Sequence, residues 1–235
     1  MLRPDLTRAG YTVLLVLLGT TLVFGPLLKI GSAARFWTEF ITVAVMAAAV
    51  VKLSSRRAIR IAAVVAGGFS LTASIFQLLA PADLWIIARH ASSVIFVLMV
   101  AGSITHSVWH ESVVTVDTII GGIAVYILLA VAWSAGYQLV EFVRPGSFVP
   151  VNGEIGRWGP WEPAPGLYPR LLFFSFITLT TLGYGDIVPA SILAAGLASA
   201  EAVVGPLYLT ILISRLVGFH VAGLREGTGG SEPPG

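Results

Sequence analysis

The sequence has no cysteine and very little charge. Without cysteine the chain has no disulfide, no thiolate metal site and no cysteine nucleophile. Of its 235 residues, 11% are charged and 56% are hydrophobic, whereas a soluble domain has about 25% charged and about 45–50% apolar residues. Because one soluble core of this size cannot hold so much apolar surface, the composition favours a chain that lies in a lipid bilayer.

Several catalytic and binding motifs are missing as well. The sequence contains no Walker loop, no GxGxxG after a strand and no HExxH zinc motif. Its four histidines are too scattered to form a metal cluster, and its net charge of +2 indicates no basic surface. We therefore expect neither enzymatic activity, nor an organic cofactor, nor a nucleic-acid partner.

Long apolar stretches occupy most of the chain. A helix that crosses a bilayer needs about 20 mostly apolar residues. Six stretches meet or approach this length, so we predict an all-α integral membrane protein with six transmembrane helices, over Tyr11–Ile30, Phe36–Leu53, Ile61–Ala80, Leu84–Ile104, Val113–Phe142 and Ala190–Phe219. The first stretch resembles a signal peptide, but it is long for one and has no clear cleavage site, so we predict that it is retained.

The region between the fifth and sixth stretches differs from the rest. Residues Val143–Pro169 are rich in Pro, Gly and Trp and cannot span a membrane. The apolar segment that follows, Arg170–Thr181, is too short to cross and fits a re-entrant half-helix. It occurs only once in the chain.

Basic residues set the predicted orientation. The cluster Lys52, Arg56, Arg57 and Arg60 lies between the second and third predicted helices. Cytoplasmic loops carry an excess of Lys and Arg, so we place this loop and both termini in the cytoplasm. The Trp-rich segment then faces outward, and the tail after the sixth helix is expected to be disordered.

The string LFFSFITLTTLGYGD, from Leu172 to Asp186, resembles the pore helix and selectivity filter of potassium channels. Gly183 and Gly185 permit backbone conformations that turn successive carbonyls toward one axis. A plain Gly-Tyr-Gly turn between two helices is the alternative, but it does not explain the half-helix before it.

The resemblance implies an ion path of backbone oxygens. Potassium ions are expected at the carbonyls of Thr181, Leu182, Gly183 and Tyr184, with Gly185 completing the filter and the Thr181 hydroxyl closing the innermost site. Tyr184 is expected to brace the filter against the pore helices. One chain supplies one filter strand, so the resemblance implies a homotetramer in a bacterial plasma membrane, with potassium ions in the filter and membrane lipid around it.

The same resemblance divides the chain into four parts. They are a membrane domain that resembles a voltage sensor, a linker, a pore domain and a disordered cytoplasmic tail, over residues 1–105, 106–112, 113–219 and 220–235.

Asp186, Phe173, Ile177 and Thr180 are expected to support the filter. Many relatives have a Trp in place of Phe173, which donates a hydrogen bond to the filter aspartate, and some bacterial relatives have a Glu in place of Ile177. Asp186 has therefore lost two partners, and we expect an outer filter that is held less rigidly. The alternative is that Trp158, Trp161 or Tyr168 replaces the lost contact.

The sixth helix carries three features that stand out. Gly205 lies nineteen residues after Asp186, the spacing of the family's hinge glycine, and Pro206 removes a backbone donor beside it. Leu209 and Ile213 follow at helical spacing and are expected to line the cavity. Glu201 is an acid within the span, and we expect it to bond a pore-helix hydroxyl, Ser175 or Thr178.

The fourth predicted helix has the position of a voltage sensor but only one arginine, Arg89. Steep gating uses about three or four charges per subunit. We therefore expect weak voltage gating or none, and a fixed ion pair between Arg89 and Glu39.

Potassium-selective conduction is the function that these patterns favour. The alternatives are a poorly selective cation channel of the same fold, a potassium transporter, and a non-conducting partner subunit.

Overall fold

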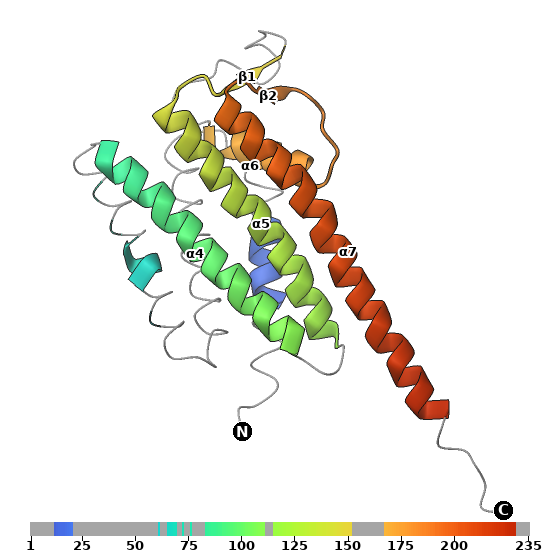
Figure 1. Ribbon diagram of the computed structural model, residues 1–235. Coiled ribbons are helices and arrows are strands. Elements are labelled where there is room, and N and C mark those ends of the chain that lie inside the picture. The colour runs from blue at the N-terminus through green and yellow to red at the C-terminus, as the bar shows by residue number, and fades with distance from the viewer. Residues whose placement is uncertain are drawn as a thin grey trace, which may run out of the picture.

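The computed structural model describes residues 12–20, 61, 65–69, 72, 76, 83–110, 115–151 and 167–228. Within that part, the labelled elements are α4 (Asp83–His110), α5 (Val116–Val143), β1 (Phe148–Pro150), α6 (Leu167–Leu179), β2 (Ile187–Pro189) and α7 (Ile192–Thr228). The long helices α4, α5 and α7 run side by side, and the short helix α6 lies near one end, close to the two strands (Figure 1).

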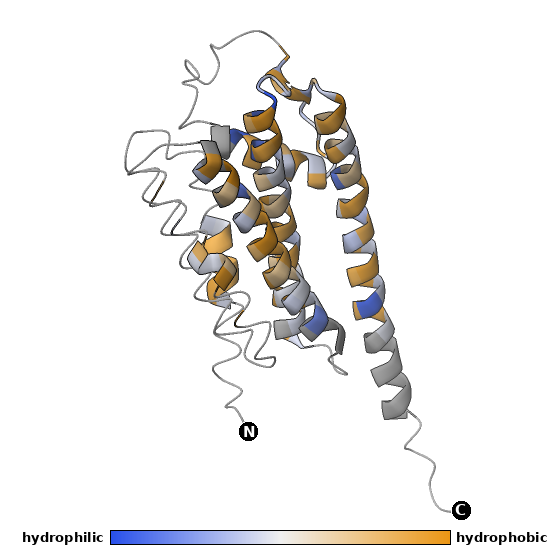
Figure 2. Ribbon diagram, turned by 60° about the vertical axis from the view of Figure 1, so that its left-hand side comes forward, coloured by the Kyte–Doolittle hydropathy of each residue, from blue (hydrophilic) through white to orange (hydrophobic). Residues whose placement is uncertain are grey.

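Two stretches of the described residues are long and apolar enough to cross a membrane. They are Thr118–Val143 and Ile192–Gly218, which correspond to the fifth and sixth predicted helices. Figure 2 shows hydrophobic residues along most of α5 and much of α7. A capping box at Thr115 begins α5, because Thr115 and Thr118 each accept a hydrogen bond from the other's backbone N–H, at 3.3 and 3.2 Å.

The first half of the chain is described in pieces. Residues 12–20 are helical, inside the first predicted span, and residues 65–69 are helical inside the third. The second predicted span, Phe36–Leu53, lies outside the described residues, so the count of six stays a prediction.

Helix extends into two segments that were predicted as a linker and a disordered tail, while the domain division itself stays a prediction. Helix α4 continues to His110, so the predicted linker 106–112 begins as helix; no Gly or Pro interrupts the chain from Ser103 to His110. Helix α7 continues to Thr228, well into the predicted disordered tail, because the residues after Phe219 include several good helix formers and no proline before Pro233.

The pore helix also differs from its predicted range of 170–181. Helix α6 begins at Leu167, three residues earlier, and ends at Leu179. Pro169 lies in its first turn, where proline is tolerated because its missing N–H would be unpaired there anyway. Thr180 and Thr181 form a turn that leads into the filter.

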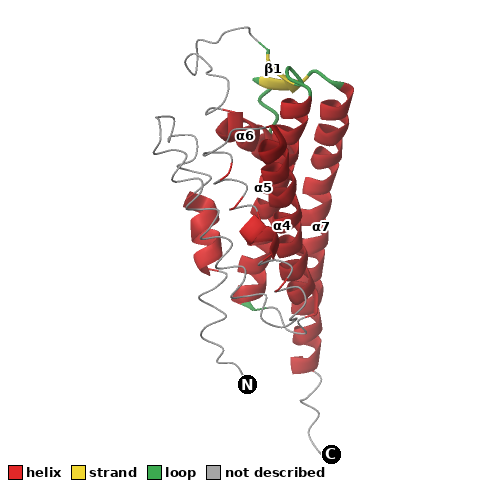
Figure 3. Cartoon of the chain, turned by 90° about the vertical axis from the view of Figure 1, so that its left-hand side faces the viewer, coloured by secondary structure: helices red, strands yellow, loops and turns green. Residues whose placement is uncertain are grey.

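The all-α prediction missed a small sheet. Strands β1 and β2 pair antiparallel, with Val149 opposite Val188. Two flanking hydrogen bonds lengthen the ribbon, from Val151 N to Asp186 O at 3.2 Å and from Ala190 N to Ser147 O at 2.7 Å. Figure 3 shows the ribbon at one end of the helices. Because β2 directly follows Asp186, the ribbon joins the loop after α5 to the chain segment that leaves the predicted filter.

The described part has two apolar cores. The first lies where α4 packs on α5 and on residues 12–20. The second gathers the rings of Tyr137, Phe148 and Phe174, which meet edge to face at centroid distances of 5.1, 5.3 and 5.4 Å. This second core holds α5, β1 and α6 together next to the predicted filter.

Candidate functional site

The backbone after α6 alternates between two conformations. Thr181, Gly183 and Gly185 have positive φ angles of 58°, 54° and 70°, whereas Leu182 and Tyr184 do not. Alternation of this kind brings successive backbone N–H groups to one side of the chain. The carbonyls of the same peptide units then lie on the other side.

Hydrogen bonds show that the backbone N–H groups lie on the side of this segment that faces α6. Leu182 N and Gly183 N both donate to the Ile177 carbonyl, at 2.8 and 3.0 Å, and Thr181 N donates to the Thr178 carbonyl at 3.0 Å. The N–H groups therefore face the pore helix. Since C=O and N–H point in opposite directions in a trans peptide, the carbonyls of Thr181 and Leu182 point away from it.

Thr181 occupies a strained backbone position. A positive φ is a genuine outlier for a β-branched residue, and such strain costs about 1–3 kcal/mol and clusters at functional sites. Gly183 and Gly185 adopt the same region without a Cβ. The surroundings of Thr181 must therefore impose its conformation.

The two side chains that follow Thr181 are open in the single chain. Leu182 is 55% and Tyr184 66% exposed. The Tyr184 ring nevertheless stacks on Phe173 of α6, with centroids 6.1 Å apart and planes at 15°; its role in bracing the filter stays a prediction. Thr180 bonds back to α6 through its hydroxyl, which lies 2.7 Å from the Phe176 carbonyl.

Asp186 lacks a side-chain partner within the described part of the chain. Its Oδ1 is buried and makes no hydrogen bond there, and Phe173 and Ile177 have no group to offer. Trp158 and Trp161 lie outside the described residues, as does the side chain of Tyr168. The backbone at Asp186 is held instead by the ribbon, through the bond from Val151 N.

For the potassium channel that the sequence resembles, replacing Phe173 by tryptophan should slow the loss of current during sustained opening. An indole N–H that reaches the Asp186 carboxylate would add a hydrogen bond to a charged group, which contributes about 1.5–3 kcal/mol. The measurement is the decay of potassium current in a prolonged recording. Naphthylalanine at the same position is the control, because it has the size of tryptophan without the N–H; equal decay with both residues would contradict the hydrogen-bond explanation.

The end of the pore helix is enclosed by two other helices. The Tyr126 hydroxyl of α5 donates to the Leu179 carbonyl at 2.9 Å. From α7, Gly205 approaches the same carbonyl so closely that a Cβ on it would lie 2.1 Å from the Leu179 oxygen. Gly205 was predicted as a hinge. The structure places it where α7 packs on α6. Helix α7 continues through Gly205 and Pro206 without a break. The carboxyl end of α6, which carries partial negative charge, is thereby fixed.

The two faces of α7 differ below this point. Tyr208 and Leu212 face α5: the Tyr208 hydroxyl donates to the Gly122 carbonyl at 2.8 Å, and Leu212 is buried. Leu209 and Ile213, predicted to line the cavity, are 36% and 56% exposed. They lie on the face of α7 that no other described residue of the chain covers.

A buried carboxyl lies behind the pore helix. Glu201 Oε1 lies 2.5 Å from the Ser175 hydroxyl, and the Tyr137 hydroxyl donates to Oε2. The predicted bond between Glu201 and Ser175 is confirmed. Tyr137 was missed, although a phenol within an apolar span, like an acid, is a polar group that needs a partner.

A second acid organises the turn after α5. Glu141 accepts hydrogen bonds from Gly146 N at 2.8 Å and from Phe148 N at 3.0 Å. These bonds orient the chain as it enters β1. The predicted pair of Glu39 and Arg89 cannot be placed in the same way, because Glu39 and the Arg89 side chain lie outside the described residues.

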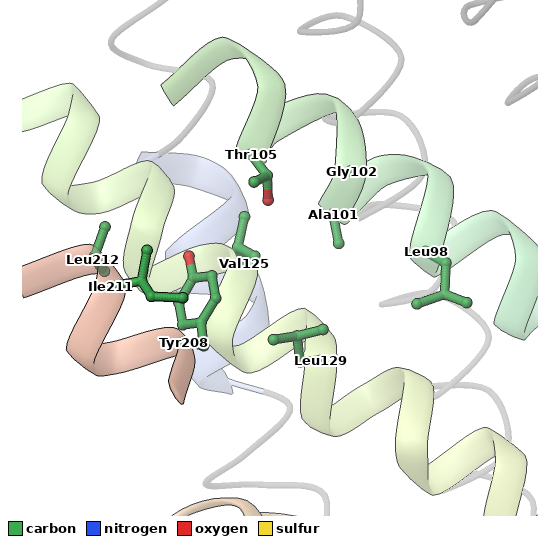
Figure 4. A pocket seen from close by; sticks show the side chains of 9 residues that line it. All are labelled: Leu98, Ala101, Gly102, Thr105, Val125, Leu129, Tyr208, Ile211 and Leu212. Atoms are coloured by element: carbon green, nitrogen blue, oxygen red, sulfur yellow. The ribbon is translucent and has the colours of Figure 1, made fainter. Parts of the chain in front are cut away.

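An apolar cavity of about 330 Å³ lies between α4, α5 and α7, away from the filter (Figure 4). Its lining comes from all three helices and consists of Leu98, Ala101, Gly102, Thr105, Val125, Leu129, Tyr208, Ile211 and Leu212. The cavity therefore belongs to the packing of α4 against α5 and α7 rather than to the exposed face of α7.

Comparison with known proteins identifies the same region. Residues 161–221 match a family model described as an ion channel; the matched stretch contains α6, the segment from Thr181 to Asp186, β2 and most of α7. No curated protein and no solved structure matches the chain. The two membrane-capable helices and this match support a mostly helical membrane protein with an ion-channel domain at residues 161–221.

Proposed function

We propose that this chain is one subunit of a homotetrameric potassium channel and that the carbonyls of residues Thr181–Tyr184 bind the permeant ions. The observation that carries this proposal is the backbone alternation, which directs the N–H groups of Leu182 and Gly183 to Ile177 O and turns the carbonyls of Thr181 and Leu182 away from α6. Rings of such carbonyls replace the hydration shell of a potassium ion, so the ion crosses passively.

The exposed surfaces support a tetramer. One chain supplies one filter strand, and a closed ring of carbonyls needs four. Leu182, Tyr184 and the α7 face with Leu209 and Ile213 are open in the single chain. In a fourfold assembly the first two would meet neighbouring subunits, and the α7 face would line the cavity below the filter.

The charge of α4 supports weak voltage dependence or none. Arg89 is its one Arg or Lys. A charge that crosses the field contributes about 2.3 kcal/mol per 100 mV, so one arginine supplies at most about a third of the charge that steep gating uses. In this proposal the pore domain begins before α5, both termini are cytoplasmic, and the membrane is a bacterial plasma membrane.

The buried Asp186 Oδ1 favours one alternative, a poorly selective cation channel of the same fold. A filter whose outer end lacks a side-chain partner can be less rigid, and less rigid carbonyl rings discriminate less between ions. A potassium transporter and a non-conducting partner subunit have no such observation in their favour.

Planar-bilayer recording of the purified chain separates these functions. With potassium on one side and sodium on the other, we expect discrete openings, a reversal potential near that of potassium and a shallow voltage dependence. A reversal potential near zero would support the poorly selective channel instead. Flux without discrete openings would support a transporter, and a tetramer without current would support the partner subunit.

A further inference from the structure

The polar cluster behind the pore helix joins three helices at one carboxyl group. Glu201 of α7, Tyr137 of α5 and Ser175 of α6 are all fully buried. Each oxygen of the Glu201 carboxyl has its own partner, Ser175 for Oε1 and Tyr137 for Oε2. The Glu201 carboxyl thus contacts both α5 and α6 from α7.

The single hydroxyl hydrogen of Ser175 limits which groups in this cluster can donate. Ser175 Oγ lies 2.8 Å from the Ala130 carbonyl as well as 2.5 Å from Glu201 Oε1. A carbonyl can only accept, and a serine hydroxyl has one hydrogen. If Ser175 donates to Ala130, the proton between Ser175 and Glu201 must come from Glu201.

The Tyr137 hydroxyl supplies the proton of the remaining bond, to Oε2. All three hydrogen bonds are therefore satisfied together when Glu201 is a neutral carboxylic acid. A neutral acid also avoids the large cost of a charge in an apolar, membrane-embedded site.

The cluster is connected to the filter through a short length of helix. Ser175 precedes Ile177 by two residues on α6, and the Ile177 carbonyl accepts the N–H groups of Leu182 and Gly183. The Ser175 hydroxyl fixes α6 to Ala130 of α5 on one side and to Glu201 of α7 on the other. A shift of α6 at Ser175 would therefore move the acceptor that orients the filter carbonyls.

We propose that Glu201 is a neutral carboxylic acid that positions the pore helix, and through Ile177 O the filter. This inference rests on the proposed channel function for its effect on ions, but the protonation of Glu201 can be measured without it. It assigns Glu201 a role in selectivity although the side chain does not touch the ion path.

The proposal predicts a specific order among substitutions. Glu201→Gln keeps the pattern, because its amide oxygen accepts from Tyr137 and its amide N–H donates to Ser175. We expect it to keep the potassium-to-sodium permeability ratio of the parent. Glu201→Ala removes both bonds, and we expect the ratio to fall about tenfold, the size of effect that one lost hydrogen bond produces.

Two further variants separate positioning from general loss of stability. Ser175→Ala breaks the link between Glu201 and α6 together with the bond from Ser175 to Ala130, and Tyr137→Phe breaks only the link between Glu201 and α5. We expect Ser175→Ala to reduce the permeability ratio and Tyr137→Phe to change it much less, with all variants first shown to be assembled in detergent by mass. Equal effects of the two, or a Glu201→Gln variant that behaves like Glu201→Ala, would overturn the positioning role.

Infrared difference spectroscopy tests the proton directly. At neutral pH the parent minus Glu201→Gln spectrum should contain a carboxylic-acid C=O band that shifts in deuterium oxide. A carboxylate band in its place would overturn the neutral acid. If the acid band is present but the parent does not select potassium, the proposed channel function fails while the protonation stands, so the two failures are distinguishable.

Discussion

Replacing Gly183 by alanine should abolish the selectivity for potassium over sodium that we propose for this chain. Gly183 has a φ of 54°, and a Cβ built on it meets no atom within 4 Å, so its cost is conformational rather than a clash within the chain. A left-handed alanine costs about 1–2 kcal/mol in each chain, and in a homotetramer four strands bring this to about 4–8 kcal/mol for one filter. The backbone can relieve this strain by turning the peptide, which takes Gly183 N away from Ile177 O and a carbonyl out of the ion path.

Gly146 offers a matched control for this experiment. It has a φ of 83°, a Cβ on it also meets no atom within 4 Å, and it lies in the turn between α5 and β1. Gly146→Ala therefore applies comparable backbone strain outside the filter. Reversal potentials in mixed potassium and sodium should shift toward zero for Gly183→Ala and stay unchanged for Gly146→Ala; an unchanged ratio in Gly183→Ala would refute the carbonyl filter.

Replacing Gly205 by alanine should destabilise the pore by a different route. The new Cβ would lie 2.1 Å from the Leu179 oxygen and 3.0 Å from its carbon, and backbone atoms cannot yield as a flexible side chain can. Overpacking of this kind costs about 1–3 kcal/mol or more in each chain. We expect α7 to move away from α6, the bond from Tyr126 to Leu179 O to be lost, and current to disappear.

Gly102 is a matched control, because the same change from glycine to alanine meets open space there instead of a backbone atom. It lies in α4 beside the apolar cavity, and a Cβ on it meets no atom within 4 Å (Figure 4). Gly102→Ala should therefore stabilise α4 by about 0.5–1 kcal/mol. Thermal unfolding in detergent measures both variants. If Gly205→Ala unfolds at the same temperature as the parent and changes only the open probability, Gly205 acts as a hinge rather than as a packing position.

The short helix α6 and the strained turn after it could be predicted because their signals are local. A short apolar segment followed by Thr-Thr-Leu-Gly-Tyr-Gly-Asp locates the pore helix and filter within a few residues. The bond from Glu201 to Ser175 could be predicted because an acid inside an apolar span must have a partner, and Ser175 is one of the few hydroxyls on the pore helix.

Other parts of the site leave no pattern in the sequence. Strands β1 and β2 have three residues each and end in Pro150 and Pro189, so they are too short to show alternation and contain a residue that strands disfavour. The bond from Tyr126 to Leu179 joins a side chain to a backbone oxygen 53 positions away, and backbone acceptors look alike in every residue. Helix ends are equally hard to place, as the extension of α7 to Thr228 shows.

The ribbon has a topological consequence. Pairing of Phe148 with Pro189 closes the chain between them into a loop, and α6 and the filter both lie inside that loop. Closure reduces the number of conformations open to the enclosed chain, so ribbon, pore helix and filter should open and close as one cooperative unit. The natural module to transplant into another channel is then the whole segment from Phe148 to Pro189. The filter sequence moved alone would lack the pairing of β1 with β2 that closes the loop.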